Sequence, residues 1–146
     1  SFGPEYALDT VSKNQVTVLY LQGGKLPPSL SIDNSLEAMQ RLVGGYIEEY
    51  MPFDDEVALI CNEEGKMNGS SLNRAAYDEH SKEMIEIIAG DFFIAYAPVG
   101  SENFKSLPKD LEKKYAEKFK YPERFYKQNG QIKAYPVKPK NRDMER

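Results

Sequence analysis

The strongest β-forming stretch of the chain, Ile85–Tyr96, is short and is broken in its middle by Gly90-Asp91. β-branched and aromatic residues fill both halves, which predicts a strand with a bulge or tight turn at the glycine. Further short β-prone runs are each ended by glycine, proline or asparagine: Gln15–Gln22, Leu30–Ile32, Tyr46–Met51 and Val57–Asn62. Strands this short and numerous predict one mixed or antiparallel sheet.

Two helices are expected beside the strands before residue 100. Asn34 is a suitable N-cap with Glu37 three residues later, and Gly44 suits the left-handed position after the last turn. Ser70 or Ser71 is suited to cap a second, short helix over Leu72–Tyr77.

The composition changes after residue 100. Leu107, Leu111, Tyr115 and Phe119 are four apart on a charged segment, which predicts a helix with one apolar stripe, and Asn129-Gly130 between two β-prone arms predicts a hairpin. The chain therefore reads as a single α+β domain. Its core is expected at residues 15–100, and residues 101–146 are expected to form a basic helix-hairpin extension packed on that core.

Composition limits the class of protein. The chain has 146 residues, of which 40% are apolar and 12% aromatic, so it can bury a core as one ordinary domain. No apolar run is long enough to span a bilayer. A single cysteine allows no internal disulfide, which predicts a cytoplasmic protein.

Charge is unevenly distributed. Residues 1–100 hold 16 acidic and 6 basic residues, whereas residues 101–146 hold 7 acidic and 13 basic ones. A basic arm lying over an acidic body explains this, and so does an acidic face that meets a basic partner. Direct nucleic-acid contact by the body is disfavoured, because its charge has the wrong sign.

Catalytic motifs are absent around the one cysteine and the one histidine. Gly65-Lys66 is followed by Met67, so it is no phosphate-binding loop. Cys61 continues an apolar run and precedes acidic residues, which predicts an inert core thiol. His80 lies in a polar segment that is typical of a solvated loop. No catalytic residue and no cofactor are therefore predicted.

Two alternatives use the acidic residues. Asp54, Asp55 and Glu56 are adjacent, and three carboxylates can hold a divalent metal for an enzyme. A solvated acidic loop explains the same three residues. Spaced carboxylates can also imitate phosphates, which would make the protein a decoy for a nucleic-acid-binding protein.

Polar residues around two expected turns, at Glu64-Gly65 and Asn68-Gly69, suggest a binding site. Asn73-Arg74 at the expected helix start, with Tyr46 and Asn62, could line a small pocket. Arginine grips phosphate or carboxylate groups with two N–H donors, and helix N-termini favour anions. The alternative is that the asparagines only serve the turns and a helix cap.

Four short motifs resemble the domain-of-unknown-function family DUF3846 of gut bacteria, plasmids and phages. The motifs are Gly44–Glu48, Glu63–Lys66, Asn73-Arg74 and Ile88–Gly90. The resemblance covers about residues 15–97 and implies a cytoplasmic protein associated with mobile elements.

The function expected from these observations is non-enzymatic binding of a small anionic ligand or a host protein, in a role that counters host defence. Tyr46, Asn62, Asn73 and Arg74 are the expected binding residues.

Overall fold

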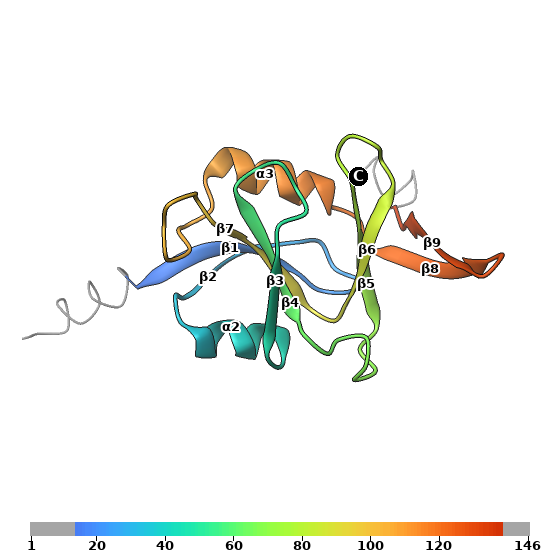
Figure 1. Ribbon diagram of the computed structural model, residues 1–146, viewed down its shortest axis with the longest axis horizontal. Helices are drawn as coiled ribbons and strands as arrows, with labels where there is room; N and C mark the ends of the chain where they lie inside the picture. The colour runs from blue at the N-terminus through green and yellow to red at the C-terminus, as the bar shows by residue number, and fades with distance from the viewer. Residues whose placement is uncertain (1–13, 139–146) are drawn as a thin grey trace, which may run out of the picture.

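A computed structural model describes residues 14–138, which form three sheets and two helices (Figure 1). The two helices separate runs of consecutive strands, as expected of an α+β domain. In chain order the elements are β1 Gln15–Leu21, β2 Ser29–Asp33, α2 Leu36–Val43, β3 Ile47–Tyr50, β4 Val57–Asn62, β5 Leu72–Tyr77, β6 Met84–Ala89, β7 Phe92–Tyr96, α3 Lys109–Lys118, β8 Glu123–Gln128 and β9 Gln131–Pro136.

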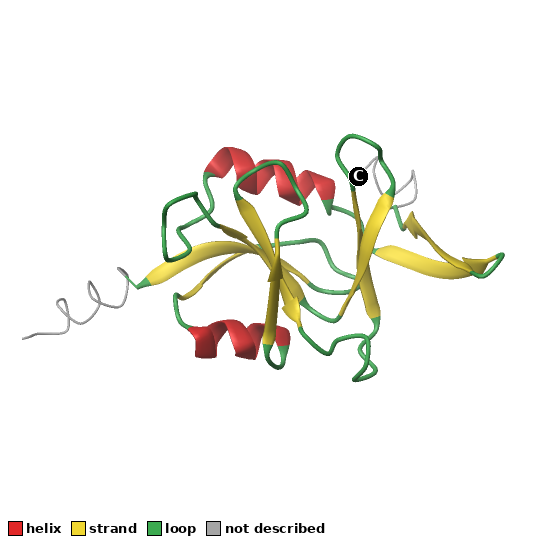
Figure 2. Ribbon diagram, viewed as in Figure 1, coloured by secondary structure: helices red, strands yellow, loops and turns green. Residues whose placement is uncertain are grey.

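A five-stranded sheet forms the centre, in the order β2-β1-β7-β4-β3, with every neighbouring pair antiparallel. The two helices cover its opposite faces (Figure 2). Alternate residues of a strand point to opposite faces, so the sheet supplies two clusters of buried side chains. Met39 and Val43 of α2 belong to one cluster, and Tyr115 and Phe119 of α3 belong to the other. The single-domain α+β prediction is confirmed.

Helix α2 begins one residue later than predicted. Ser35 rather than Asn34 is the N-cap, and its hydroxyl accepts a hydrogen bond from the Ala38 N–H at 3.2 Å. The Asn34 side chain instead donates to the Phe104 carbonyl at 3.1 Å. The predicted end is confirmed, because Gly44 closes the helix at a φ of 79°.

The predicted short helix over Leu72–Tyr77 is wrong, since this segment is strand β5. It pairs antiparallel with β6, so that Arg74 lies opposite Ile88 and Ala75 opposite Ile87. Ala76 and Ile88 close the cluster beneath α3. Burial against that cluster and pairing with β6 outweigh the helical propensity of the arginine and alanines.

Gly90 divides the strongest β segment into strands of two different sheets. Its φ is 81°, and the chain leaves β6 there to enter β7 at the centre of the large sheet. The stretch expected to be one strand with a bulge or tight turn is therefore two strands of different sheets, and the bend at Gly90 places the β5–β6 hairpin beside the central sheet.

The end of the described chain forms a second hairpin, β8–β9, as predicted. Asn129 and Gly130 both adopt positive φ, at 53° and 79°, in the turn between the strands. Leu107, Tyr115 and Phe119 belong to the same core cluster as the strands before residue 100. The expected division of the chain at residue 100 stays a prediction.

Candidate functional site

Two of the four predicted binding residues lie together. Asn62 and Asn73 line a cleft of about 520 Å³ between the end of α2, the loop at residues 68–71 and the Gly90-Asp91 turn. Tyr46 and Arg74 are not among the residues that line it. Tyr46 is highly exposed, whereas Arg74 is fully buried.

The guanidinium group of Arg74 donates its hydrogen bonds mainly to backbone carbonyls of the protein itself. Nε donates to the Phe119 carbonyl at 3.2 Å, and Nη2 donates to the Lys25 carbonyl at 2.7 Å. Nη1 donates to the Gln22 carbonyl at 3.4 Å and to Oδ1 of Asn73 at 2.8 Å. Burial lowers the pKa of this arginine below its usual value. Arg74 therefore cross-links three segments: its own strand β5, the loop after β1 and the end of α3. Its N–H donors are not directed toward a site where an anion could bind.

The two asparagine amides are also engaged within the fold. Nδ2 of Asn73 donates to the carbonyls of Leu21 and Gly90, each at 2.9 Å. Asn62 donates to the Val43 carbonyl at 3.1 Å and accepts from the Glu64 N–H at 2.8 Å. Both side chains thus satisfy backbone groups of the fold. Asn62 serves its turn, as the sequence alternative suggested, whereas Asn73 caps no helix because it lies in strand β5.

The charges in this cleft have opposite signs. Arg41 is exposed at its edge, and Asp91 accepts a hydrogen bond from the Tyr20 hydroxyl at 3.0 Å. Burial, with Asp91 beside it, raises the pKa of Tyr20 to about 12. With Arg74 turned inward, the cleft has little preference for an anion.

The three adjacent carboxylates diverge. Asp54 contacts Nε2 of His80 at 2.7 Å, and Glu56 accepts from the Val99 N–H at 2.9 Å. Asp55 accepts from Lys114 at 2.5 Å and from the Tyr115 hydroxyl at 2.8 Å, and these two bonds hold its pKa below the usual range. Within residues 14–138, no group of three His, Cys, Asp or Glu side chains is arranged to hold a metal ion. The geometry gives no support to the metal-dependent alternative.

Cys61 lies beside a second, smaller cavity of about 230 Å³, which Tyr50, Lys66 and Glu86 also line. The thiol is buried, and burial with nearby Glu48 and Glu86 raises its pKa to about 11. A thiol with this pKa stays protonated near neutrality and is a poor nucleophile. The position agrees with an inert core cysteine.

A third hollow, of about 530 Å³, has a different character. It runs between the start of α2, the edge strand β3 and the loop at residues 97–104, and we call it the acidic groove. Met39 and Phe104 lie at its wall, and the apolar side chains at its margin are exposed. Its lining residues are Asn34, Ser35, Leu36, Met39, Glu49, Met51 and residues 97–104.

The margin of the acidic groove exposes three large apolar side chains. Leu36 is 57% exposed, Met51 49% and Val99 86%. Apolar side chains gathered around a hollow, with polar residues at the rim, are typical of surfaces that bind a partner. The carboxylates in the lining are Glu49 and Glu102, and the lining contains no lysine or arginine.

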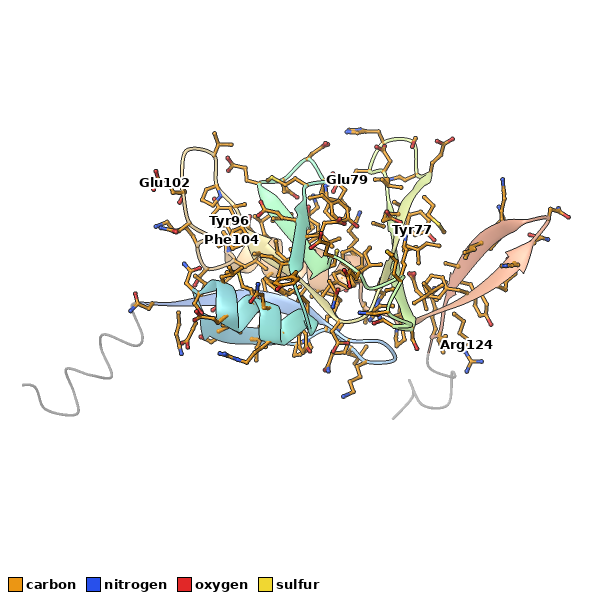
Figure 3. The ribbon with its side chains drawn as sticks, turned by 60° about the horizontal axis from the view of Figure 1, so that its bottom comes forward. Tyr77, Glu79, Tyr96, Glu102, Phe104 and Arg124 are labelled. Carbon is orange, nitrogen blue, oxygen red and sulfur yellow. The ribbon has the colours of Figure 1, made fainter. Side chains whose placement is uncertain are left out.

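The loop of the acidic groove is held in place before any partner arrives. Asn34 binds the Phe104 carbonyl, and Glu56 binds the Val99 N–H through its side chain and the Ala97 N–H through its carbonyl. Phe104 lies toward the body, whereas Glu102 points outward from the loop (Figure 3). Binding at a loop fixed in this way costs little ordering of the backbone.

Sequence reasoning missed the acidic groove. Its residues come from three separate segments, and Val99 appears in the sequence only as one apolar residue of a proline-glycine loop. One signal could have pointed to it. Glu49 and Met51 are two residues apart in the predicted strand at Tyr46–Met51, so their side chains share one face of that strand.

Comparison with known proteins identifies a family and no individual relative. Within residues 14–138, neither helix has the length and apolar character that crossing a membrane requires. No curated protein and no solved structure matches the chain. The family model described as "Domain of unknown function (DUF3846)" matches residues 16–120, which include both helices and every strand of the central sheet. The chain belongs to the DUF3846 family.

Proposed function

We propose that this protein is a non-enzymatic binding protein whose acidic groove takes a basic, amphipathic segment of a host protein. The observation that carries the proposal is the exposure of Leu36, Met51 and Val99 around one hollow with Glu49 and Glu102 in its lining. A segment that presents apolar side chains between lysines or arginines complements this surface in both shape and charge.

The choice of a protein segment over a small anionic ligand follows from the charges. Glu49 and Glu102 repel an anion, and the only ion pairs formed by described acidic residues involve Asp54, Asp55, Glu79, Glu86 and Glu112. Neither groove carboxylate therefore has a cationic partner among residues 14–138. Both are available to a lysine or arginine of a partner.

The wider setting is part of the same proposal. We infer that the protein is encoded on a mobile element or phage and that its binding partner is a cytoplasmic factor of the host. Blocking a host defence factor through the groove is the role that this setting favours. The proposal assigns no catalytic step and no cofactor.

Site-specific photo-crosslinking tests the proposal. A photoreactive amino acid replaces Val99 in one variant and Leu26 in a matched control, because Leu26 is 64% exposed but lies outside the groove. Each variant is irradiated in a bacterial host. We expect a discrete adduct at position 99 and none at position 26, and mass spectrometry of the adduct should find lysine or arginine beside apolar residues.

Charge reversal provides the decisive control. Glu49→Lys together with Glu102→Lys should abolish the adduct at position 99 while leaving the thermal unfolding of the protein unchanged, since both side chains are exposed. An adduct that persists in this double variant, or that forms equally at position 26, would contradict binding in the acidic groove.

A further inference from the structure

The β8–β9 hairpin projects from the body at the end of the molecule opposite the loop at residues 97–104 (Figure 1). It lies outside the segment that the family model matches. Its link to the body runs through β5, where a carboxylate oxygen of Glu123 accepts the Ala75 N–H at 2.8 Å. The hairpin is therefore an addition to the part of the chain that matches the family model, residues 16–120.

The two faces of the hairpin differ. Residues opposite each other in an antiparallel pair share a face, and successive pairs alternate. Phe125 and Ala134 are paired and half-buried, so their face is the inner one near the body. The pairs on the outer face are Arg124 with Tyr135, Tyr126 with Lys133, and Gln128 with Gln131.

The outer face combines cations, aromatic rings and amides. Tyr126 and Tyr135 are 46% and 47% exposed, and their ring centroids lie 5.9 Å apart. The two tyrosines form one diagonal of this face, and Arg124 and Lys133 form the other, because each cation is paired with the tyrosine of the opposite strand. Arg124 projects from the base of the hairpin, away from the central sheet (Figure 3).

No carboxylate belongs to the outer face. The acidic residue of the hairpin, Glu123, is on the inner face and is bonded to β5. Neither Arg124 nor Lys133 forms an ion pair with a carboxylate of residues 14–138. Lys114 of α3, by contrast, is paired with Asp55. Lys114 is therefore already paired within the fold, whereas Arg124 and Lys133 remain available to an anionic ligand.

We propose that the outer face of the β8–β9 hairpin binds single-stranded nucleic acid. Its occupant must offer anions to Arg124 and Lys133 and flat groups to the rings of Tyr126 and Tyr135. An unpaired strand supplies both, with phosphates along its backbone and bases that stack on aromatic side chains. A duplex keeps its bases stacked on each other, and the acidic side chains of a peptide carry no aromatic ring to stack on the tyrosines.

The acidic body limits the length of the contact. Residues before 101 repel phosphate, so the strand is held by the hairpin alone, whose six-residue strands span about 20 Å. Screening over about 10 Å at moderate salt separates the hairpin from that repulsion. The expectation of no direct nucleic-acid contact came from the charge of the body, and the outer face is a separate surface.

Fluorescence anisotropy of the full chain tests this assignment, with labelled oligothymidylate and oligouridylate as probes in a salt series that starts at about 0.1 M, where the body's repulsion is screened. The two probes separate DNA from RNA as the source of the strand. With two cations in the contact, log K should fall with log salt at a slope of about −1.4. We expect binding of at least one probe and weaker competition by a duplex of the same length.

Variants of the two faces make the test specific. Tyr126→Leu or Tyr135→Leu should weaken binding about tenfold, whereas the Phe variants should stay within about twofold, because stacking needs the ring and not the hydroxyl. Lys133→Ala should lower the salt slope by about 0.7. Lys127→Ala removes a cation from the inner face of the same hairpin and should leave binding unchanged.

Three results would overturn the proposal. The first is the absence of binding to both probes by the unaltered chain at about 0.1 M salt. The second is an equal loss in Lys127→Ala and Lys133→Ala, which would reveal diffuse attraction. The third is displacement of the probe by polyglutamate as readily as by unlabelled strand, which would assign the face to an acidic protein.

Discussion

Arg74 joins three segments that are distant in the sequence. Its guanidinium binds the carbonyls of Gln22 and Lys25 after β1 and that of Phe119 after α3. Each of these carbonyls needs a donor once it is shielded from water. The arginine therefore fastens β5 to both ends of the fold.

Replacing Arg74 tests this role directly. Arg74→Leu should lower the free energy of unfolding by at least about 3 kcal/mol, because several carbonyls lose their donor and each costs about 1–3 kcal/mol. Urea denaturation followed by circular dichroism measures the change. Arg124→Leu, at an exposed position, should change stability by less than about 0.5 kcal/mol. Equal effects of the two substitutions would contradict the cross-linking role.

Asp55 makes the stability depend on pH. Lys114 and Tyr115 lower its pKa in the folded state, so its charged form is favoured more strongly there than in the unfolded chain. The resulting stabilisation is complete above the unfolded-state pKa of about 4 and disappears as pH falls through the lower folded-state pKa.

Asp55→Asn should therefore cost about 1 kcal/mol near neutral pH, and the difference from the unaltered protein should vanish in acid. Urea denaturation at a series of pH values measures it. Glu83→Gln serves as the control, since Glu83 is exposed. A difference for Asp55→Asn that stays constant into strong acid would show that the lost contact is not one of charge.

At the scale of elements, the turn after β4 is packed directly against the end of β6. A Cβ atom on Gly65 would lie 2.6 Å from the Ala89 carbonyl oxygen, closer than side-chain carbons approach backbone. The glycine is thus needed for close approach between two elements and not for phosphate binding.

Gly65→Ala should lower the melting temperature by several degrees, corresponding to about 1–3 kcal/mol, because the turn must move away from β6. Differential scanning calorimetry provides the measurement. Gly23→Ala is the matched control, since a Cβ there meets nothing within 4 Å. A stable Gly65→Ala variant would mean that the turn has room to shift.

Elements were predictable where local pattern and tertiary setting agree. Val57–Asn62 was expected from its apolar run, and β4 has the same bounds. The segment at Leu72–Tyr77 was misassigned because the serines before it and its own arginine and alanines suit a helix locally, whereas pairing with β6 decides its structure. Sequence patterns report local preference and contain little about such long-range pairing.

The candidate sites were harder to predict than the elements. Arg74 looked available for a ligand because its acceptors, on Gln22, Lys25 and Phe119, are remote in sequence. The acidic groove likewise assembles from α2, β3 and a loop. The outer face of the hairpin could have been predicted from the sequence. Its Asn-Gly turn fixes the register of the two strands, and the register determines which residues share a face.

The whole molecule divides into a family core and a projecting hairpin. No residue of either buried cluster lies beyond Phe119, and the family match ends at residue 120. A chain ending at Lys120 should therefore still unfold cooperatively, at a lower temperature because Ala75 loses its contact with Glu123.

Thermal unfolding followed by circular dichroism tests this expectation on the shortened chain. A broad transition without cooperativity would show that the hairpin is an integral part of the fold. A cooperative shortened chain would also provide a hairpin-free reference for measurements on the nucleic-acid face.

The position of β7 has a consequence for synthesis of the chain. β1 and β4 do not pair with each other, and each joins the sheet only through β7. A growing chain therefore holds two separate hairpins, β1–β2 and β3–β4, each with an unpaired inner edge, until Tyr96 has left the ribosome. Unpaired edges recruit other chains. Slow translation between Asn62 and Phe92 lengthens that exposure, so yield of folded protein should depend on the codons of this stretch.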